Sequence, residues 1–241
     1  MSKIGIAVFP GSNCERDIYH VLNNILNLHA DYIWHTKDKI TGFDATIIPG
    51  GFSYGDRLRA GIIAANSPII NEVKRMAKDG LPILGICNGF QILIESCLLP
   101  GALMMNNSLN FVCRWTTVKV QNNKTPFTNC FQKNQKFQIP VAHGEGRYVV
   151  NNQILNDLKK NNQIVLRYFN DDPNGSYDSI AGICNEEGNV MGMMPHPERA
   201  SEKLLSPNRF SNDAILVFRS LISYFDHHEP LRSKKKAIVR Y

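Results

Sequence analysis

The sequence predicts an α/β fold in a single domain, with a doubly wound sheet that is mixed but mostly parallel. Over the first hundred residues, short apolar segments of strand length alternate with amphipathic segments at helical spacing. This alternation is typical of a parallel sheet with helices on both faces. From Phe111 to Val150, polar and apolar residues alternate instead, which favours antiparallel strands. With 241 residues and 43% hydrophobic content, the chain can bury one substantial core.

The first half of the chain contains four strand candidates and three helix candidates. The strands are short apolar runs followed by turn residues: Lys3–Val8, 32–34, Ala45–Ile48 and 82–86. The helices have apolar residues every three or four positions: 18–28, 69–78 and 89–96. Because crossovers between parallel strands are right-handed, we expect the loops after these strands to lie at one edge of the sheet, with any active site there.

The second half predicts a different arrangement. Residues 115–120 and 137–141 alternate as antiparallel strands do, either within a mixed sheet or as an inserted hairpin. Further short strands are expected at 165–169, 179–184 and 190–194. A closing helix is expected over 211–225, where apolar residues share one side: Ile215, Phe218, Leu221 and Ile222.

The charge distribution predicts one domain over residues 1–228 and a basic, flexible tail over 229–241. The net charge is +6, but several of its basic residues lie in the last ten positions: Arg232, Lys234, Lys235, Lys236 and Arg240. The rest of the chain is therefore close to neutral. We interpret the tail as a solvated segment and expect no nucleic-acid partner.

Membrane, secreted and disulfide-rich proteins are disfavoured. No stretch approaches the roughly 18–20 consecutive apolar residues of a membrane helix, and the opening run is too short for a signal peptide. We expect a cytoplasmic protein without a membrane partner. The cysteines contain no C-x-x-C pair and predict neither a zinc cage nor a disulfide framework; they are Cys14, Cys87, Cys97, Cys113, Cys130 and Cys184.

The segment Leu84-Gly85-Ile86-Cys87-Asn88-Gly89-Phe90-Gln91 is the strongest local signal for chemistry. Here an apolar strand meets a helix, and glycines bracket a cysteine. In such an elbow the nucleophile stands on a tight bend that the glycines keep uncrowded. The helix N-terminus favours the thiolate. Cys87 is therefore a candidate nucleophile, although a buried structural cysteine is an alternative.

His196 and Glu198, in Met194-Pro195-His196-Pro197-Glu198, are the candidate partners of Cys87. The proline after His196 disfavours helix at that residue. In an extended segment, residues two apart project the same way, so Glu198 can hold one imidazole nitrogen while the other faces the thiolate. His196 would then protonate a leaving amine and activate water. A proline-rich turn without function is the alternative.

A glycine-rich turn, Ile48-Pro49-Gly50-Gly51-Phe52-Ser53-Tyr54-Gly55-Asp56, follows another strand. Its backbone N–H groups could form half of an oxyanion hole, with Asn88 providing the other half. A phosphate cradle is the rival, but the chain contains neither G-x-x-x-x-G-K-[ST] nor G-x-G-x-x-G. We also expect no metal at Cys87, His196 and Glu198, because no second histidine stands at ligand spacing.

These three motifs together resemble the class I, triad-type glutamine amidotransferases, whose sheet is flavodoxin-like. Further segments resemble the family of small glutaminase subunits of phosphoribosylformylglycinamidine synthase: Phe9-Pro10-Gly11-Ser12-Asn13-Cys14, Pro49 to Asp56, Ala142-His143-Gly144-Glu145-Gly146 and Gly192-Met193-Met194-Pro195-His196-Pro197-Glu198-Arg199. The resemblance runs from Lys3 to Phe225 with the motifs in the family's order.

The resemblance implies that Cys87, His196 and Glu198 hydrolyse L-glutamine to glutamate and ammonia through a thioester. It also implies backbone or substrate contacts from a second group: Gly50, Gly51, Phe52, Asn88 and Gln91. A third group would lie near the pocket or a partner surface without a catalytic step: His143, Gly144, Glu145 and Gly146.

The resemblance further implies a place in de novo purine synthesis. Ammonia would pass through an enclosed path to a large synthetase subunit, and a small third subunit is also expected. The large synthetase subunit would use ATP to convert formylglycinamide ribonucleotide to formylglycinamidine ribonucleotide. No cofactor is expected in this chain, so ATP and Mg²⁺ belong to the synthetase partner.

Three other functions remain open from the sequence. The triad constrains glutamine cleavage but not the ammonia acceptor, so the chain could serve a different synthetase. A non-catalytic regulatory subunit of the same fold is less favoured because all three triad residues are present. A flavodoxin-like redox protein would need a phosphate-binding first loop rich in Ser and Thr, which residues 9–14 are not.

Overall fold

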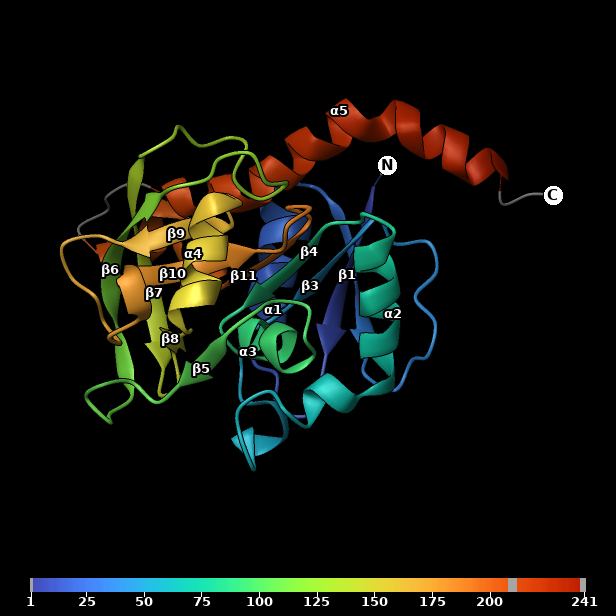
Figure 1. The fold of residues 1–241 in the computed structure, drawn as a ribbon. Helices are drawn as coiled ribbons and strands as arrows, with labels where there is room; N and C mark the ends of the chain where they lie inside the picture. The colour runs from blue at the N-terminus through green and yellow to red at the C-terminus, as the bar shows by residue number, and fades with distance from the viewer. Residues whose placement is uncertain (1, 208–211, 239–241) are drawn as a thin grey trace.

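A nine-stranded mixed sheet forms the centre of the protein in the computed structural model, which describes residues 2–207 and 212–238, with side chains described as far as residue 227 (Figure 1). From one edge to the other, the strands are β2 (His29–Trp34), β1 (Lys3–Val8), β3 (Ala45–Ile48), β4 (Ile83–Ile86), β11 (Val190–Met193), β10 (Ile180–Cys184), β9 (Ile164–Tyr168), β6 (Val112–Val120) and β7 (Lys136–His143).

The half of the sheet from β2 to β11 is parallel. β1 pairs with β2 and β3, and β4 pairs with β3 and β11, all in parallel register. Ile86 at the end of β4 lies opposite Met193 at the end of β11. Because the strands run in one direction, the loops after β1, β3, β4 and β11 meet at one edge of the sheet.

The other half is antiparallel, so the predicted mixed sheet is confirmed. β10 pairs with β11 and β9, and β6 pairs with β9 and β7. The long β6–β7 pair runs from Val112 opposite His143 to Lys119 opposite Lys136, and it brings residue 143 to the same region as the parallel loops. A separate two-stranded sheet joins β5 (Ala102–Met104) to β8 (Arg147–Val149).

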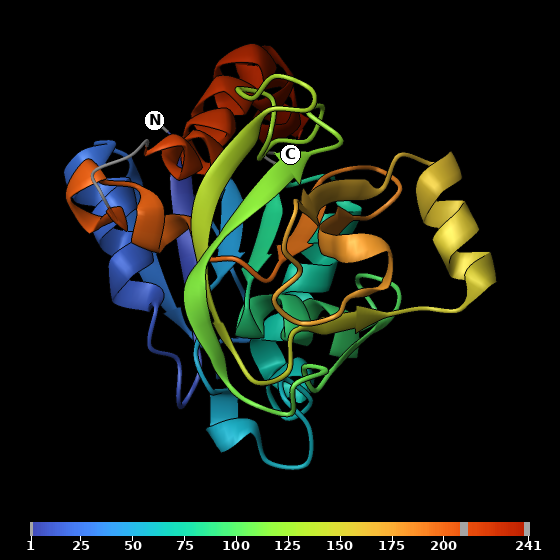
Figure 2. The same ribbon diagram turned by 90° about the vertical axis from the view of Figure 1, so that its left-hand side faces the viewer.

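Helices lie on both faces of the parallel half. The α-helices that the structure describes are α1 (Glu15–Tyr19), α2 (Pro68–Lys78), α3 (Asn88–Glu95), α4 (Asn152–Lys160) and α5 (Leu216–Ile238). α1 lies on one face, and α2 and α3 lie on the other (Figure 2). α3 packs on β4 and β11, so the segment that follows Cys87 is fixed to the middle of the sheet.

Shorter helical turns join these elements. α1 continues directly into a π-helical segment, His20–Ile25, so the helix expected over 18–28 begins earlier and changes its winding. The 3₁₀ turns are Ser53–Asp56, Ala64–Asn66, Tyr177–Ser179, Pro197–Ala200, Lys203–Leu205 and Asp213–Ile215.

The C-terminal helix differs from the predicted range. Position 211, the expected start, lies outside the described residues, and α5 begins at Leu216. α5 runs to Ile238, past the boundary expected at 228, so that boundary and the flexibility of residues 229–241 stay predictions. In the part of the chain that the structure describes, no helix is long and apolar enough to cross a membrane.

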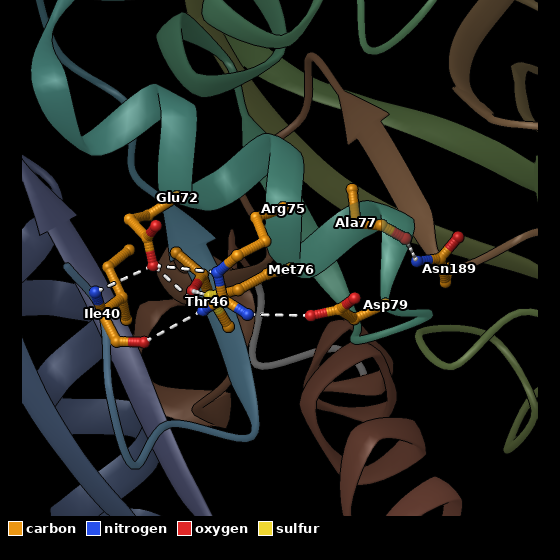
Figure 3. A network of polar contacts seen from close by, with 8 residues as sticks. All are labelled: Ile40, Thr46, Glu72, Arg75, Met76, Ala77, Asp79 and Asn189. Carbon is orange, nitrogen blue, oxygen red and sulfur yellow. Dashed lines mark hydrogen bonds and ion pairs between the residues drawn. The ribbon is translucent and has the colours of Figure 1, made fainter. Parts of the chain in front are cut away.

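A polar network fastens α2 to the sheet beneath it (Figure 3). Arg75 pairs with Glu72 at 2.9 Å and with Asp79 at 2.8 Å, and it also donates to the carbonyl of Ile40. Asn189, in the turn before β11, donates to the last turn of α2 at Ala77. The network therefore joins α2 to the loop after β2 and to the turn that precedes β11, the strand that leads to His196.

Candidate active site

Cys87 stands on a strained bend between β4 and α3. Its backbone has φ 52° and ψ −106°, a conformation that L residues other than glycine seldom adopt. Both bracketing glycines are required by close packing. A Cβ on Gly85 would lie 2.6 Å from the Gly89 carbonyl oxygen, and one on Gly89 would lie 2.0 Å from that of Ile48. The sequence thus folds into the tight elbow expected of a nucleophile.

His196 and Glu198 lie at the end of β11 and form a buried pair. His196 Nδ1 and Glu198 Oε1 are 2.6 Å apart, and each residue is 2% exposed. In the described residues, the other ring nitrogen, Nε2, has no hydrogen-bond partner. Burial alone would lower the pKa of His196, but the Glu198 carboxylate and the Cys87 sulfur together hold it well above its ordinary value. These two neighbours thus favour the protonated, imidazolium form of His196.

Gly50 lies between the Cys87 elbow and the His196–Glu198 pair. A Cβ at this position would lie 2.8 Å from His196 Cε1, 3.0 Å from Cys14 Sγ and 3.4 Å from Cys87 Cβ. Three side chains from the segments that follow β1, β4 and β11 therefore surround one glycine in the turn after β3. Cys87, which is 5% exposed, also lies 3.6 Å from the carbonyl oxygen of Ala142.

Cys14 is a member of this cluster that sequence reasoning missed. Its sulfur lies 3.9 Å from His196 Nδ1, accepts from Arg199 at 3.1 Å and donates to Asn13 at 3.0 Å. Burial raises the pKa of the Cys14 thiol, although His196 and Arg199 oppose this. Cys14 and His196 are 182 positions apart in sequence, so no local spacing could reveal the contact.

In the turn after β3, one of the backbone N–H groups expected to bind an oxyanion is free within the described part of the chain, and another is already engaged in a hydrogen bond. The N–H of Phe52 already donates to Gly11 at 2.9 Å. In residues 2–207 and 212–238, the N–H groups of Gly51 and Asn88 donate to no acceptor. Gly51 has φ 148°, and a Cβ there would lie 2.8 Å from the backbone of Asn13. Gly51 and Asn88 therefore remain available to an oxyanion, whereas Phe52 offers its ring, which is 45% exposed.

Asn88 and Gln91 form a buried amide chain behind the elbow. Asn88 accepts from the N–H of Ser53 at 3.1 Å and donates to Gln91 at 2.8 Å, and Gln91 in turn donates to the carbonyl of Glu145 at 2.7 Å. Asn88 also contacts Asp56 at 3.4 Å. Burial, assisted by Glu145, raises the pKa of Asp56 to about 6. The expected substrate residue Gln91 is thus held by neighbours at both ends of its amide.

The loop 142–146 is fixed by Asn106. His143 Nδ1 lies 3.1 Å from Asn106 Oδ1, and Asn106 donates to the carbonyl of His143 while its own N–H donates to Gly144. The N–H of Gly146 donates to the same side-chain oxygen, and a Cβ there would lie 2.4 Å from the His143 ring. Burial, with a smaller contribution from His196, lowers the pKa of His143 to about 4. His143 is thus a neutral, buried ring near His196.

Comparison with known proteins gives a consistent family. Residues 1–225 match the CobB/CobQ-like glutamine amidotransferase domain. The chain is 48% identical over 237 residues to phosphoribosylformylglycinamidine synthase subunit PurQ of Moorella thermoacetica, covering 95% of this chain and 99% of the relative.

Solved structures agree with that match. A chain of PurLQS from Thermotoga maritima superposes with a TM-score of 0.84 at 46% identity, covering 93% of this chain and 99% of the other. The glutaminase domain of Trypanosoma brucei CTPS with bound acivicin has a TM-score of 0.58 at 15% identity, covering 92% of this chain and 94% of the other. The second likeness concerns the fold alone.

Proposed function

The chain belongs to the family of CobB/CobQ-like glutamine amidotransferase domains, and we propose that it is the glutaminase subunit of phosphoribosylformylglycinamidine synthase. The observation that carries this proposal is the Cys87 elbow beside the buried His196–Glu198 pair. This arrangement occurs in a chain 48% identical to a PurQ subunit along almost its whole length. The substrate of the site is L-glutamine.

The first half-reaction forms a thioester on Cys87. The thiolate attacks the side-chain amide carbon of glutamine, and the oxyanion that forms accepts hydrogen bonds from the N–H groups of Gly51 and Asn88. His196, as imidazolium, gives its Nε2 proton to the departing nitrogen, which leaves as ammonia. Glu198 keeps the proton on Nδ1, so that Nε2 is the nitrogen that exchanges protons.

The second half-reaction hydrolyses the thioester. Neutral His196 takes a proton from water through Nε2, and the hydroxide attacks the acyl carbon in the same oxyanion hole. Glutamate leaves and Cys87 returns to the thiolate. The strained backbone at Cys87 keeps its sulfur at this position through both steps.

Glutamine contacts come from the walls of the site. We assign Gly50 the role of leaving space between Cys87 and His196, and Phe52 an apolar side of the pocket. Gln91 faces the substrate with the second proton of its amide nitrogen. The loop that holds His143, Gly144, Glu145 and Gly146 closes the pocket and faces the partner.

The ammonia is used by a large synthetase subunit, and a small third subunit completes the complex. ATP and Mg²⁺ bind the synthetase. Support for docking near the site comes from a hollow of about 560 Å³ beside Glu145. Its lining includes apolar side chains that are exposed in the free chain: Leu58, Met104, Met105 and Leu109. An exposed apolar patch of this kind marks an interaction surface. We place the protein in the cytoplasm, where thiols stay reduced.

The test is ammonia release from glutamine, measured alone and with the synthetase subunit, its ribonucleotide substrate and ATP. We expect release to require Cys87 and to rise when the complex is complete. Cys87→Ala should abolish release, whereas Cys184→Ala, which removes a buried cysteine in β10, should keep it. Release that survives in Cys87→Ala would contradict the proposal. Release that never couples to the synthetase would leave the glutaminase and remove the purine assignment.

A further inference from the structure

Cys14 belongs to the buried cluster around His196 but has no step in the proposed hydrolysis. Its sulfur lies 3.9 Å from His196 Nδ1, which lies 2.6 Å from Glu198 Oε1. One donor atom from each of the three residues lies within 4.8 Å of the other two, and all three residues are buried. A thiol sulfur, an imidazole nitrogen and a carboxylate oxygen therefore converge on one point.

This set of donors matches the preferences of Zn²⁺. The ion binds Cys at about 2.3 Å and His at about 2.0–2.1 Å in a tetrahedron, which puts the sulfur and nitrogen about 3.5 Å apart. The observed separation in Cys14–His196 is 3.9 Å, so these two ligands need to approach by only a few tenths of an ångström, whereas the 2.6 Å contact between His196 and Glu198 has to open to admit the ion. Mg²⁺ and Ca²⁺ prefer all-oxygen sites and are a poorer match.

Two further observations point to a ligand at this position. Glu198 Oε2 is buried and has no hydrogen-bond partner in the described residues, although buried carboxylate oxygens are normally paired. Arg199 donates to Cys14 Sγ at 3.1 Å and pairs on its other side with Asp17 at 3.4 Å. An N–H donor of this kind stabilises a metal-bound thiolate from the outer shell.

We propose that Cys14, His196 and Glu198 form a binding site for Zn²⁺, and that the bound ion inhibits glutamine hydrolysis. The inhibition, but not the binding, rests on the proposed function. Zn²⁺ takes the place of the Cys14 thiol proton and of the proton on His196 Nδ1, and both protons pass to solvent. Water completes the tetrahedron. Cys87 is not a ligand.

The chemistry of the ring explains the inhibition. With Zn²⁺ on Nδ1, the single proton of the neutral imidazole lies on Nε2, so this nitrogen is a donor only. His196 is then no longer an imidazolium that readily gives a proton to the departing nitrogen, and its Nε2 cannot accept a proton from water. The Glu198 carboxylate is also drawn from the Nδ1–H bond to the metal, so the ring loses the partner that orients it.

Binding is tested with Co²⁺, which takes tetrahedral Zn²⁺ sites and shows a thiolate charge-transfer band. The reduced full chain is titrated with Co²⁺ and then with competing Zn²⁺, as wild type, Cys14→Ala, Cys87→Ala and Cys184→Ala. We expect one equivalent of the band in all except Cys14→Ala, where Zn²⁺ affinity falls by about tenfold or more. Absence of the band from wild type, its survival in Cys14→Ala or its loss in Cys87→Ala would overturn the site. Cys14→Ser repeats the test should Cys14→Ala not fold.

Inhibition is tested by ammonia release with Zn²⁺ and then with a chelator. We expect Zn²⁺ to stop release and the chelator to restore it, and the Zn²⁺ concentration for half inhibition to rise about tenfold or more in Cys14→Ser, whatever its own rate. Equal sensitivity of the two proteins would show that inhibition does not depend on Cys14 and contradict the proposal. Should wild type release no ammonia, the proposed function falls, and the Co²⁺ titration still decides the metal site.

Discussion

At the scale of single residues, the site depends on a glycine, Gly50, which has no side chain. Cys14, Cys87 and His196 approach one another because position 50 has no Cβ; an added one would lie within 2.8–3.4 Å of all three side chains. The closeness of these side chains also affects the charge of His196, because the Cys87 sulfur is one of the groups that raise its pKa. Cys87 therefore differs from Cys184, which is also buried, because it lies close to His196, and not because it has an unusual neighbour of its own.

Gly50→Ala is predicted to separate the nucleophile from its base. A methyl group 2.8 Å from His196 Cε1 forces the ring or the elbow to move, and displacement of about 1 Å costs roughly 100-fold in rate. Ammonia release should fall by about that factor, while melting shows a folded protein. Gly188→Ala, at a turn where a Cβ meets nothing, is the control: its φ of +76° makes alanine there strained and costs some stability, but the variant should keep its rate. Equal rates in the two variants would show that Gly50 does not set the geometry.

The sequence predicted part of this site. Cys87 could be found because the elbow is local, and His196 with Glu198 because their spacing is short. The place of Cys14 could not be predicted, since its contact with His196 spans 182 positions. The use of the Phe52 N–H by Gly11 also depends on how two loops pair in space. The catalytic roles of these residues stay predictions.

At the scale of elements, the site depends on how closely α3 approaches the sheet. A Cβ on Gly89 would lie 2.0 Å from the Ile48 carbonyl oxygen in β3. Because that oxygen belongs to a strand fixed by parallel partners on both sides, the helix must move instead. α3 carries Asn88 and Gln91 and begins directly after Cys87, so its position governs the nucleophile and the amide chain together.

Gly89→Ala is therefore predicted to destabilise the fold as well as the site. Overpacking of a core costs about 1–3 kcal/mol, and this contact is with backbone that cannot yield. The melting temperature should fall by several degrees, and ammonia release should be lost. Gly80→Ala, after α2 where a Cβ meets nothing, provides the comparison: its φ of +78° makes alanine there strained, so some stability is lost, but turnover should be kept. A Gly89→Ala protein with unchanged melting and turnover would refute the close approach.

Most strands could be predicted, and the failures have physical reasons. The alternation in 115–120 and 137–141 predicted β6 and β7 because one face of each strand is buried. α4 was missed although Ile154, Leu155 and Leu158 stand at helical spacing; the helix has only nine residues, so the apolar pattern repeats over little more than two turns. β5 and β8 have three residues each, too few for a periodic pattern. The π-helical continuation of α1 depends on packing that propensity does not encode.

At the scale of the whole molecule, buried titratable groups link the site to stability. His143 has a folded pKa of about 4 against about 6.5 in an unfolded chain. Its neutral form is favoured in the fold, so its contribution to stability is complete above pH 6.5 and is lost as pH falls toward 4. The loss amounts to about 3 kcal/mol.

His143→Gln is predicted to flatten this part of the pH dependence. The difference in free energy of unfolding between wild type and variant should shrink by up to about 3 kcal/mol between pH 6.5 and pH 4. Asp56, with its pKa raised to about 6, acts in the opposite direction but is common to both proteins and cancels. Denaturant unfolding at several pH values measures the difference. A difference that is constant with pH would contradict a neutral, buried His143.

The most direct test of the central claim is the site of the acyl group during turnover. The protein is mixed with glutamine, quenched in acid within the first turnovers and mapped by peptide mass spectrometry. The account predicts a glutamyl thioester on the peptide that contains Cys87, and none on the peptide that contains Cys14, whose sulfur lies beside the same histidine. A thioester on Cys14, or glutamine hydrolysis without any acylated cysteine, would contradict it.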